Sequence, residues 1–439
     1  MDGPVARKLL VGCFRAGLAA VDPEEAVAGA IGGRPGSSRG ASPHRRSGAY
    51  GGAGSPERAI RTSLLRPIDG RVVVLALGKA APAMARGVAR ALRRDRLEGI
   101  VVSNHPSEVP EGLELLIGSH PVPDEASLEA GRALLESAGS LGAEDTALVL
   151  ISGGGSALAE VLVPGVEIAD LAEINRALLR SGADITATNI VRRRLSKLKG
   201  GGLADAIAPA RLITLIVSDV VGDDPATIAS GPTVAPAEGE GAAIDVVTGL
   251  GMLDSLDPAV VEALRRPLAH RGSPEQELHI VAGGATAAHA AAAEAERLGI
   301  PARVLDTRMS GDAGLMAGEA LDRAAFGLSV FAGETTVDVT GDGVGGRNHE
   351  AGLVAATLIQ GRSDVWFLAA GTDGIDGMTP AAGVVVDGGT IARATAAGLD
   401  ANRALERNDS GTFFGKIGEQ IVTGATGTNV GDLWLVLRD

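Results

Sequence analysis

The stretch Leu148-Val-Leu-Ile-Ser-Gly-Gly-Gly-Ser-Ala-Leu158 decides the predicted fold. Its first part belongs to a short apolar run, residues 146–151, which is typical of a strand buried on both faces. The loop Ser152-Gly153-Gly154-Gly155-Ser156 follows at once and precedes sequence that could open a helix. Glycines allow a sharp turn, expose successive N–H groups and leave room for a bulky anion where a Cβ would clash. The loop matches neither G-x-x-x-x-G-K-[ST] nor G-x-G-x-x-G, so it predicts either a phosphate cradle or a plain strand-to-helix turn.

The sequence around this loop alternates between strands and helices. Apolar runs predict further strands at 71–77, 99–103, 113–118 and 212–217, and helices are predicted near 82–94 and 125–140. This alternation is typical of parallel βαβ units with helices on both faces of the sheet. Ligands of such sheets bind at the carboxyl ends of the strands, which is where Lys79 and the Ser152–Ser156 loop fall.

The alternation stops near residue 240 and resumes near residue 278. We therefore expect two α/β domains: an N-terminal Rossmann-like domain over residues 1–240, with a parallel sheet covered on both faces, and a C-terminal α/β domain over residues 278–439. Residues 241–277 are predicted to form a linker. Residues 32–57, rich in Gly, Ser, Pro and Arg, are predicted to be a flexible insertion, because this composition cannot bury a core.

Composition, net charge and cysteine count limit the kinds of protein that this chain can be. The chain has 439 residues, of which 45% are apolar and 21% charged, as in globular proteins. Its net charge of −14 argues against non-specific binding to nucleic acid. No apolar run approaches the roughly 20 residues that span a membrane, and Cys13 is the only cysteine, so an internal disulfide is impossible. We expect a cytoplasmic protein with neither nucleic acid nor membrane as partner, and a homo-oligomer stays open.

The basic residues in the loops suit phosphoryl transfer, which depends on cationic clamps and backbone cradles. Lys79 directly follows a predicted strand, and Arg347 stands between a glycine run and Asn348. The guanidinium fork of arginine suits bidentate contact with phosphate or carboxylate, and a structural salt bridge is the alternative explanation for either residue. Arg192 and Lys199 belong to a basic stretch on and after a predicted helix. They are interpreted as phosphate contacts or as part of a solvated face.

Three aspartates are candidate Mg²⁺ ligands or bases. Asp219 follows a predicted strand, and Asp373 and Asp376 lie three apart in a loop flanked by glycine. Carboxylate oxygens are the ligands that Mg²⁺ prefers. Asp-Gly pairs are also ordinary turn formers, so the same pattern is explained by turn chemistry.

Seven motifs occur in order along the chain: LALGKAA, LISGGGSAL, NIVRRRLSKLKGG, SDVVGDDPATIASGPT, GGRNHE, GTDGIDG and TGTNVGDL. Together they resemble the glycerate 2-kinases, whose carboxyl-terminal half is the MOFRL domain. The resemblance covers nearly the whole chain outside the insertion. It implies two α/β domains with the active site in the cleft between them. It also implies that Lys79 and Arg347 are the essential basic pair, and that the Ser152–Ser156 loop and Arg192 line the site.

The activity implied by this resemblance is transfer of a phosphoryl group from ATP, with Mg²⁺, to the 2-hydroxyl of D-glycerate. A second hypothesis is an NAD(P)H-dependent hydroxypyruvate reductase, a label that many members of the family once carried. Gly283-Gly284 and Asp306 stand near the spacing of a dinucleotide-binding unit, but the glycines do not form G-x-G-x-x-G. A third hypothesis is a sensor that binds a sugar acid or nucleotide without turnover.

Overall fold

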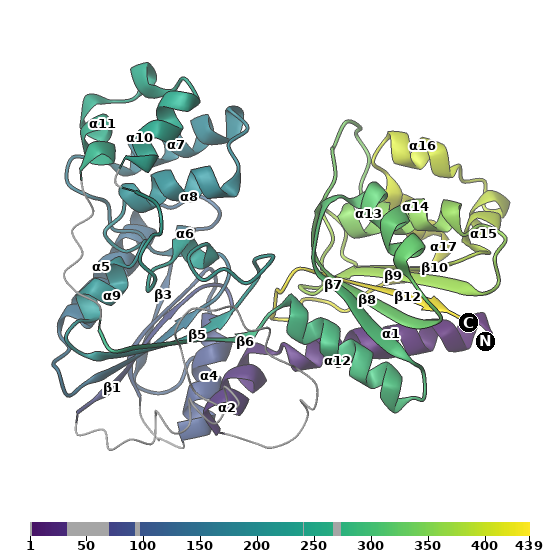
Figure 1. Ribbon diagram of the computed structural model, residues 1–439, viewed down its shortest axis with the longest axis horizontal. Helices are drawn as coiled ribbons and strands as arrows, with labels where there is room; N and C mark the ends of the chain where they lie inside the picture. The colour runs from purple at the N-terminus through teal and green to yellow at the C-terminus, as the bar shows by residue number, and fades with distance from the viewer. Residues whose placement is uncertain (1, 33–69, 93–96, 240, 267–273) are drawn as a thin grey trace. The chain divides into compact units, whose positions relative to one another are not determined.

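The computed structural model describes residues 2–32, 70–92, 97–239, 241–266 and 274–439 (Figure 1). The chain forms two compact units. The parallel-sheet unit comprises Pro23–Val217 and Asp224–Val281, and the mixed-sheet unit comprises Met1–Asp22, Ser218–Asp223 and Ala282–Asp439. Among the described helices, none has the length and apolar character needed to cross a membrane. The two expected α/β domains are confirmed.

The parallel-sheet unit contains six strands in the order β3-β2-β1-β4-β5-β6. Their bounds are β1 Val72–Leu77, β2 Glu98–Ser103, β3 Leu113–Ile117, β4 Thr146–Ile151, β5 Arg211–Val217 and β6 Gln276–Ala282. The central strands β1 and β4 are buried at every position, as their unbroken apolar runs predicted. Pairings from β3 to β5 are parallel. Strand β6 also runs parallel, because Leu212 N donates to Glu275 O and Ser218 N to Ala282 O.

Helices lie on both faces of this sheet, and the helices of residues 168–194 and 242–265 form a separate group around a core of their own (Figure 1). Their bounds are α2 Pro23–Gly32, α4 Ala81–Leu92, α5 Glu125–Gly139, α6 Gly155–Leu158, α7 Ile168–Arg180, α8 Ile185–Arg194, α9 Gly202–Ile207, η1 Ile228–Ser230, α10 Ala242–Gly249, η2 Leu253–Ser255 and α11 Pro258–Arg265. Local sequence sets their starts: Asp124 caps α5 by accepting from Ser127 N at 3.1 Å, and Asp184 caps α8 by accepting from Ala187 N at 2.7 Å.

The mixed-sheet unit contains six strands in the order β11-β10-β9-β12-β8-β7. Their bounds are β7 Ala302–Asp312, β8 Gly327–Thr336, β9 Val365–Gly371, β10 Gly383–Asp387, β11 Gln420–Ile421 and β12 Asp432–Arg438. Only β7 and β8 pair in parallel, and the other neighbours are antiparallel.

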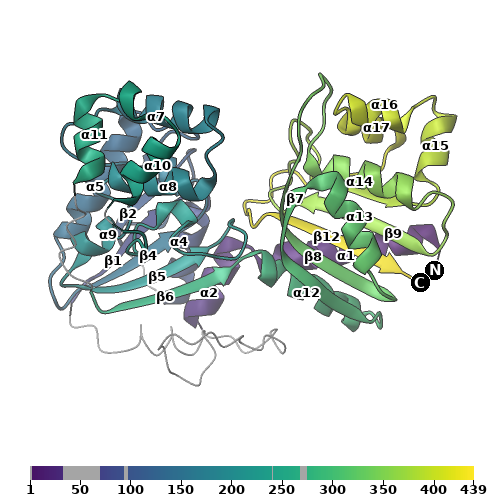
Figure 2. The same ribbon diagram turned by 45° about the horizontal axis from the view of Figure 1, so that its top comes forward.

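Helices lie on both faces of the mixed sheet, with α13 and α14 on one face and α1 and α12 on the other (Figure 2). The helix bounds are α1 Gly3–Ala20, α12 Gly284–Arg297, α13 Ala313–Arg323, α14 Arg347–Leu358, α15 Thr390–Ala396, α16 Ala401–Glu406 and α17 Ser410–Ile417. One core includes Phe331, Phe367, Phe414 and Trp434.

The compact units differ from the sequence-based boundaries. Helix α1 packs in the mixed-sheet unit: a Cβ on Gly17 would lie 2.8 Å from Leu433 Cδ2 and 3.0 Å from Ala287 O. Strand β6, expected to begin the second domain, is the sixth strand of the first sheet. Within the stretch expected to be a linker, α10 and α11 share an apolar core with α7 and α8, because Val247 and Leu264 are buried there (Figures 1 and 2). Of the expected insertion 32–57, only Gly32, the last residue of α2, lies within the described residues.

Candidate active site

Lys79 stands directly after β1, opposite the glycine loop that follows β4. Lys79 N donates to Gly153 O at 3.0 Å, and Ala80 N donates to Ser152 Oγ at 3.0 Å. These bonds join the carboxyl ends of two neighbouring strands, as parallel pairing predicts. The Lys79 residue is exposed whereas Ser152 is buried. The local fold therefore presents an ammonium group beside the glycine loop.

Gly154 makes room for the aliphatic part of the Lys79 side chain. Its φ is +82°, in the left-handed region that favours glycine. A Cβ there would lie 3.1 Å from Lys79 Cγ and Cε and 3.3 Å from His120 Cδ2. Partial burial, and then the positive charge of Lys79, lowers the pKa of His120 below its usual value. Lys79 and His120 are thus electrostatically coupled beside Gly154.

Ser156 is held from the other side by residues that the sequence analysis did not single out. Ser230 donates its hydroxyl to Asn189 Oδ1 at 2.8 Å, so Ser156 donates to Ser230 Oγ at 2.9 Å. Ala229 and Ser230 have φ values of +51° and +61°, which strain residues that carry a Cβ. A Cβ on Gly155 would lie 2.9 Å from Ala229 Cβ. The glycine loop therefore packs against a strained turn.

Arg192 and Lys199 have partners within the parallel-sheet unit. Lys199 Nζ forms an ion pair with Glu160, and both side chains are buried. Burial lowers the pKa of Lys199, and pairing with Glu160 opposes this shift. Arg192 donates Nε to Asn175 Oδ1 at 2.8 Å and remains partly exposed. The structure thus pairs Lys199 with a buried carboxylate, and a phosphate contact by Lys199 stays a prediction.

Arg347 begins helix α14 in the mixed-sheet unit. Its Nε donates to both carboxylate oxygens of Asp432, at 3.0 and 2.8 Å, and its Nη1 lies 3.4 Å from Glu334 Oε1. Asn348 Nδ2 donates to Asp432 Oδ1 at 2.8 Å, and Trp434 Nε1 donates to Asn348 Oδ1 at 2.8 Å. Burial opposes the charge on Arg347, but Asp432 and then Glu334 outweigh it and raise the guanidinium pKa further.

Two of the predicted acidic residues, Asp219 and Asp373, both act electrostatically on Glu334. Partial burial raises the pKa of Glu334; Arg347 opposes this shift, and the negative charges of Asp432, Asp219 and Asp373 add to it. The structure therefore brings Asp219 and Asp373 into the electrostatic neighbourhood of Arg347. Burial likewise raises the pKa of Asp432, which Arg347 counteracts.

Asp376 has a different environment from the other two aspartates. It is buried, and its oxygens accept hydrogen bonds from the backbone N–H groups of Asn348 and His349, at 3.1 and 2.8 Å. These bonds cap the first turn of α14, so Asp376 supports the helix that carries Arg347. Metal ligation by Asp376 stays a prediction.

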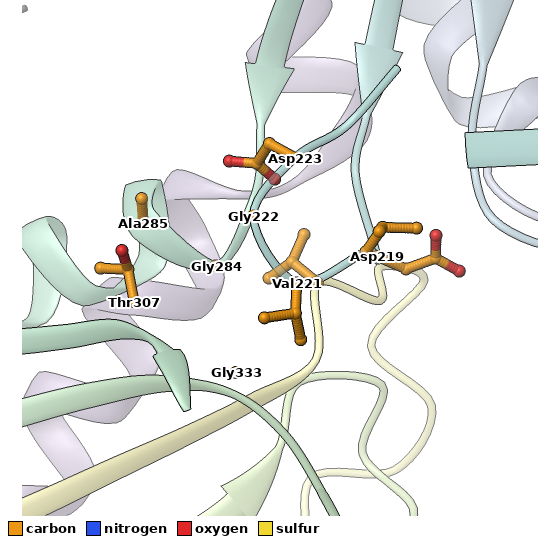
Figure 3. A pocket seen from close by; sticks show the side chains of 10 residues that line it. Asp219, Val221, Gly222, Asp223, Gly284, Ala285, Thr307 and Gly333 are labelled. Atoms are coloured by element: carbon orange, nitrogen blue, oxygen red, sulfur yellow. The ribbon is translucent and has the colours of Figure 1, made fainter. Parts of the chain in front are cut away.

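A small pocket lies beside Asp219 (Figure 3). One wall is the loop Asp219–Asp223 after β5, and another is the start of α12 at Gly284 and Ala285. Thr307 on β7 and Gly333 on β8 complete the lining named in Figure 3. Gly333 precedes Glu334, so the pocket and the Arg347 group share strand β8.

The structure thus arranges the predicted residues into two groups. Lys79 and the Ser152–Ser156 loop form one in the parallel-sheet unit, and Arg347, Asn348, Asp219 and Asp373 form the other in the mixed-sheet unit. Glu334 and Asp432 were missed. Asp432 begins β12 directly after a glycine-containing loop, whereas Glu334 lies inside β8, two residues before its end.

The sequence and the fold both have known relatives. Residues 9–265 match the family described as a domain of unknown function (DUF4147), and residues 327–432 match the MOFRL family. A D-glycerate 2-kinase of Thermotoga maritima is 36% identical, over 86% of this chain and 93% of that protein. The chain belongs to the glycerate 2-kinase family. A crystal structure of a glycerate kinase from Thermotoga maritima has a TM-score of 0.84 and 31% identity, covering 99% of this chain and all of that one.

The family also contains proteins with another name. A protein of Agrobacterium vitis that is provisionally named a hydroxypyruvate reductase is 41% identical, over 87% of this chain and 90% of that protein. Relatives of similar identity thus carry either name.

Proposed function

We propose that this chain is an ATP-dependent kinase that phosphorylates the 2-hydroxyl of D-glycerate and yields 2-phosphoglycerate and ADP. The observation that carries the proposal is the group around Arg347, where the buried Asp432 fixes the guanidinium and the charges of Asp219 and Asp373 act on Glu334. A fixed cation among carboxylates suits phosphoryl transfer, because that reaction depends mainly on positioning and charge neutralisation. The similar D-glycerate 2-kinase of Thermotoga maritima supports the same substrate.

Lys79 and Arg347 are the proposed catalytic cations. Each neutralises negative charge on phosphate oxygens, and the polar contacts proposed beside them come from Arg192 in the parallel-sheet unit and Asn348 in the mixed-sheet unit. The backbone N–H groups of the loop Ser152-Gly153-Gly154-Gly155-Ser156 suit phosphate oxygens, because glycine permits close approach.

The donor set also fits a magnesium ion. Among the described residues, no group of three or more His, Cys, Asp or Glu side chains is arranged to hold a metal. Magnesium in phosphoryl-transfer enzymes needs only one or two carboxylates, since phosphate and water supply the remaining oxygens. One of Asp219 and Asp373 would hold it, which leaves the other carboxylate to act as the base. When bound, the ion neutralises charge on the phosphate oxygens.

Transfer of the phosphoryl group forms one bond, breaks one bond and releases one proton. The 2-hydroxyl oxygen of glycerate forms a bond to the γ-phosphorus of ATP, and the bond from that phosphorus to the bridging oxygen breaks. The bond electrons leave with ADP. The hydroxyl proton passes to a carboxylate, for which Asp373 or Asp219 is the proposed acceptor.

The reductase hypothesis has less support from the fold. Under the reductase hypothesis Asp306 would contact a ribose from the end of a strand, but it lies inside β7, which continues to Asp312. Asp306 Oδ1 accepts from Arg308 N at 2.8 Å, and Oδ2 pairs with Arg323 Nη1 at 3.0 Å. Both oxygens therefore have local partners.

One assay separates the three hypotheses. Purified protein is incubated with D-glycerate, ATP and Mg²⁺, and the product is identified by phosphorus NMR, which distinguishes 2-phosphoglycerate from 3-phosphoglycerate. A parallel sample receives hydroxypyruvate and NADH, and NADH absorbance is followed. We expect 2-phosphoglycerate and constant NADH. Consumption of NADH without phosphoglycerate would establish the reductase, and binding of glycerate or ATP without turnover would establish the sensor.

A further inference from the structure

The Asp376 carboxylate accepts four hydrogen bonds, two from backbone N–H groups and two from side chains. Its Oδ1 accepts from Asn348 N at 3.1 Å and from Asn348 Nδ2 at 3.2 Å. Its Oδ2 accepts from His349 N at 2.8 Å and from His349 Nδ1 at 2.6 Å. The two backbone donors lie in the first turn of α14, where N–H groups have no partner within the helix. A single buried carboxylate therefore fixes the helix start and two of its side chains.

Two glycines, Gly346 and Gly377, leave space for the loop that carries this carboxylate. A Cβ on Gly346 would overlap the Asp376 side chain, and a Cβ on Gly377 would overlap the Gly345 carbonyl. Gly377 also has a φ of +60°. The loop that carries Asp376 and the loop that precedes α14 are thus in close backbone contact, which only glycine permits.

His349 orients Asp376 in turn. Gln420 Nε2 lies 3.1 Å from His349 Nε2 and donates to Gly411 O at 3.2 Å. The contact with the Gly411 carbonyl sets the amide so that its nitrogen faces the imidazole, which makes His349 Nε2 an acceptor. The proton of a neutral His349 is then on Nδ1, where it is donated to Asp376. His349 is fully buried, so solvent does not compete for this bond.

The same hydrogen-bond network reaches the proposed catalytic residue Arg347. Asn348, held by Asp376 through its backbone and side-chain nitrogens, also donates to Asp432, and Asp432 accepts from Arg347. We propose that Asp376, supported by His349, is a positioning residue for phosphoryl transfer: it fixes the first turn of α14 and thereby the orientation of Arg347 and Asn348. This inference rests on the proposed function and adds residues that do not touch the substrate.

The test compares Asp376→Asn with the wild-type protein in two measurements. The substitution keeps the size of the side chain but places an NH₂ group against an N–H donor. We expect kcat to fall by about 100-fold, the cost of misplacing a reacting group by about 1 Å, while KM for ATP and D-glycerate changes by less than about threefold. Hydrogen exchange of the peptide that spans residues 345–352 should become faster. Unchanged kcat in a folded variant would overturn the proposal.

A second pair of variants separates positioning from loss of folding. His349→Asn keeps a side-chain donor near the Nδ1 position, whereas His349→Leu removes it at similar size. Positioning through Asp376 predicts that kcat is preserved within about threefold by asparagine and falls at least about tenfold with leucine. Equal activities of the two folded variants would contradict the role. A wild-type protein without kinase activity would reject the kinase assignment itself, a result that the assay with D-glycerate and ATP reports separately.

Discussion

Arg347 donates its Nε to both carboxylate oxygens of Asp432, at 3.0 and 2.8 Å. The Asp432 side chain is 0% exposed, whereas the Arg347 side chain is 32% exposed. One edge of the guanidinium is thus held in the protein interior, while the group as a whole remains accessible. This is the geometry expected of a cation that is oriented in advance and acts on a ligand.

Asp432→Asn tests this orientation. The neutral side chain accepts at only one oxygen, so the guanidinium loses a fixed position, and we expect kcat to fall by about 100-fold. The matched control is Asp364→Asn, which removes the carboxylate of an Arg362–Asp364 pair at 2.7 Å with side chains 44% and 48% exposed. Exposed pairs contribute about 0–1 kcal/mol, so the control should keep full activity. Steady-state kinetics with D-glycerate decides, and equal rates for both variants would contradict the role of Asp432.

Lys79→Ala tests the second cation. Lys79 is exposed and follows β1, so its loss should leave stability within about 0.5 kcal/mol. Removing a charge that acts on the transferred group should lower kcat/KM by at least about 100-fold. Lys416→Ala removes another exposed lysine and should have no effect. A folded Lys79→Ala protein with wild-type kinetics would show that this lysine is dispensable.

Gly154→Ala tests the close approach of the loop to Lys79. The new Cβ would lie 3.1 Å from Lys79 Cγ and Cε, on a residue with a φ of +82°. Gly182→Ala is matched in backbone, since its φ is +71°, but nothing lies within 4 Å of its Cβ. Both variants should lose about 1–2 kcal/mol of stability from the left-handed backbone. Only Gly154→Ala should also lose activity, by about tenfold or more. Equal activity of the two variants would mean that the Lys79 contact does not matter.

His120 offers a pH measurement that is independent of turnover. Burial is the larger cause of its lowered pKa and Lys79 the smaller, so Lys79→Met should raise the pKa part of the way towards the usual His value of about 6.5. The folded wild-type protein holds His120 neutral, so stability is lost as pH falls through the usual His range towards the lowered pKa. NMR titration of the imidazole Cε1 proton measures the shift. An identical titration curve in the variant would exclude coupling between the two residues.

The sequence predicted most of the parallel-sheet unit because its signals are local. The apolar run of β4 and the glycines after it specify both the strand and its loop, and the Asp124 cap specifies the start of α5. The course of α1 was not predictable in this way, since its buried face contacts β12 through Leu433, more than 400 residues away. Asp376 illustrates the same limit: a turn aspartate and a helix cap have similar local sequences, and only the fold places Asn348 and His349 against it.

The buried ion pair of Lys199 and Glu160 allows a test of the hypothesis that Lys199 contacts phosphate. Both side chains are buried, with 2% and 1% exposure, and Glu160 also accepts from Val161 N at 2.9 Å. Lys199→Met would leave an uncompensated buried carboxylate, which typically costs about 3–5 kcal/mol. The double variant Glu160→Gln, Lys199→Met removes that charge and should recover much of the loss. Urea denaturation measures both free energies of unfolding, and kinetics on the folded fraction should show an unchanged KM for ATP. A variant Lys199→Met that keeps its stability but raises KM for ATP at least tenfold would instead make this lysine a phosphate ligand.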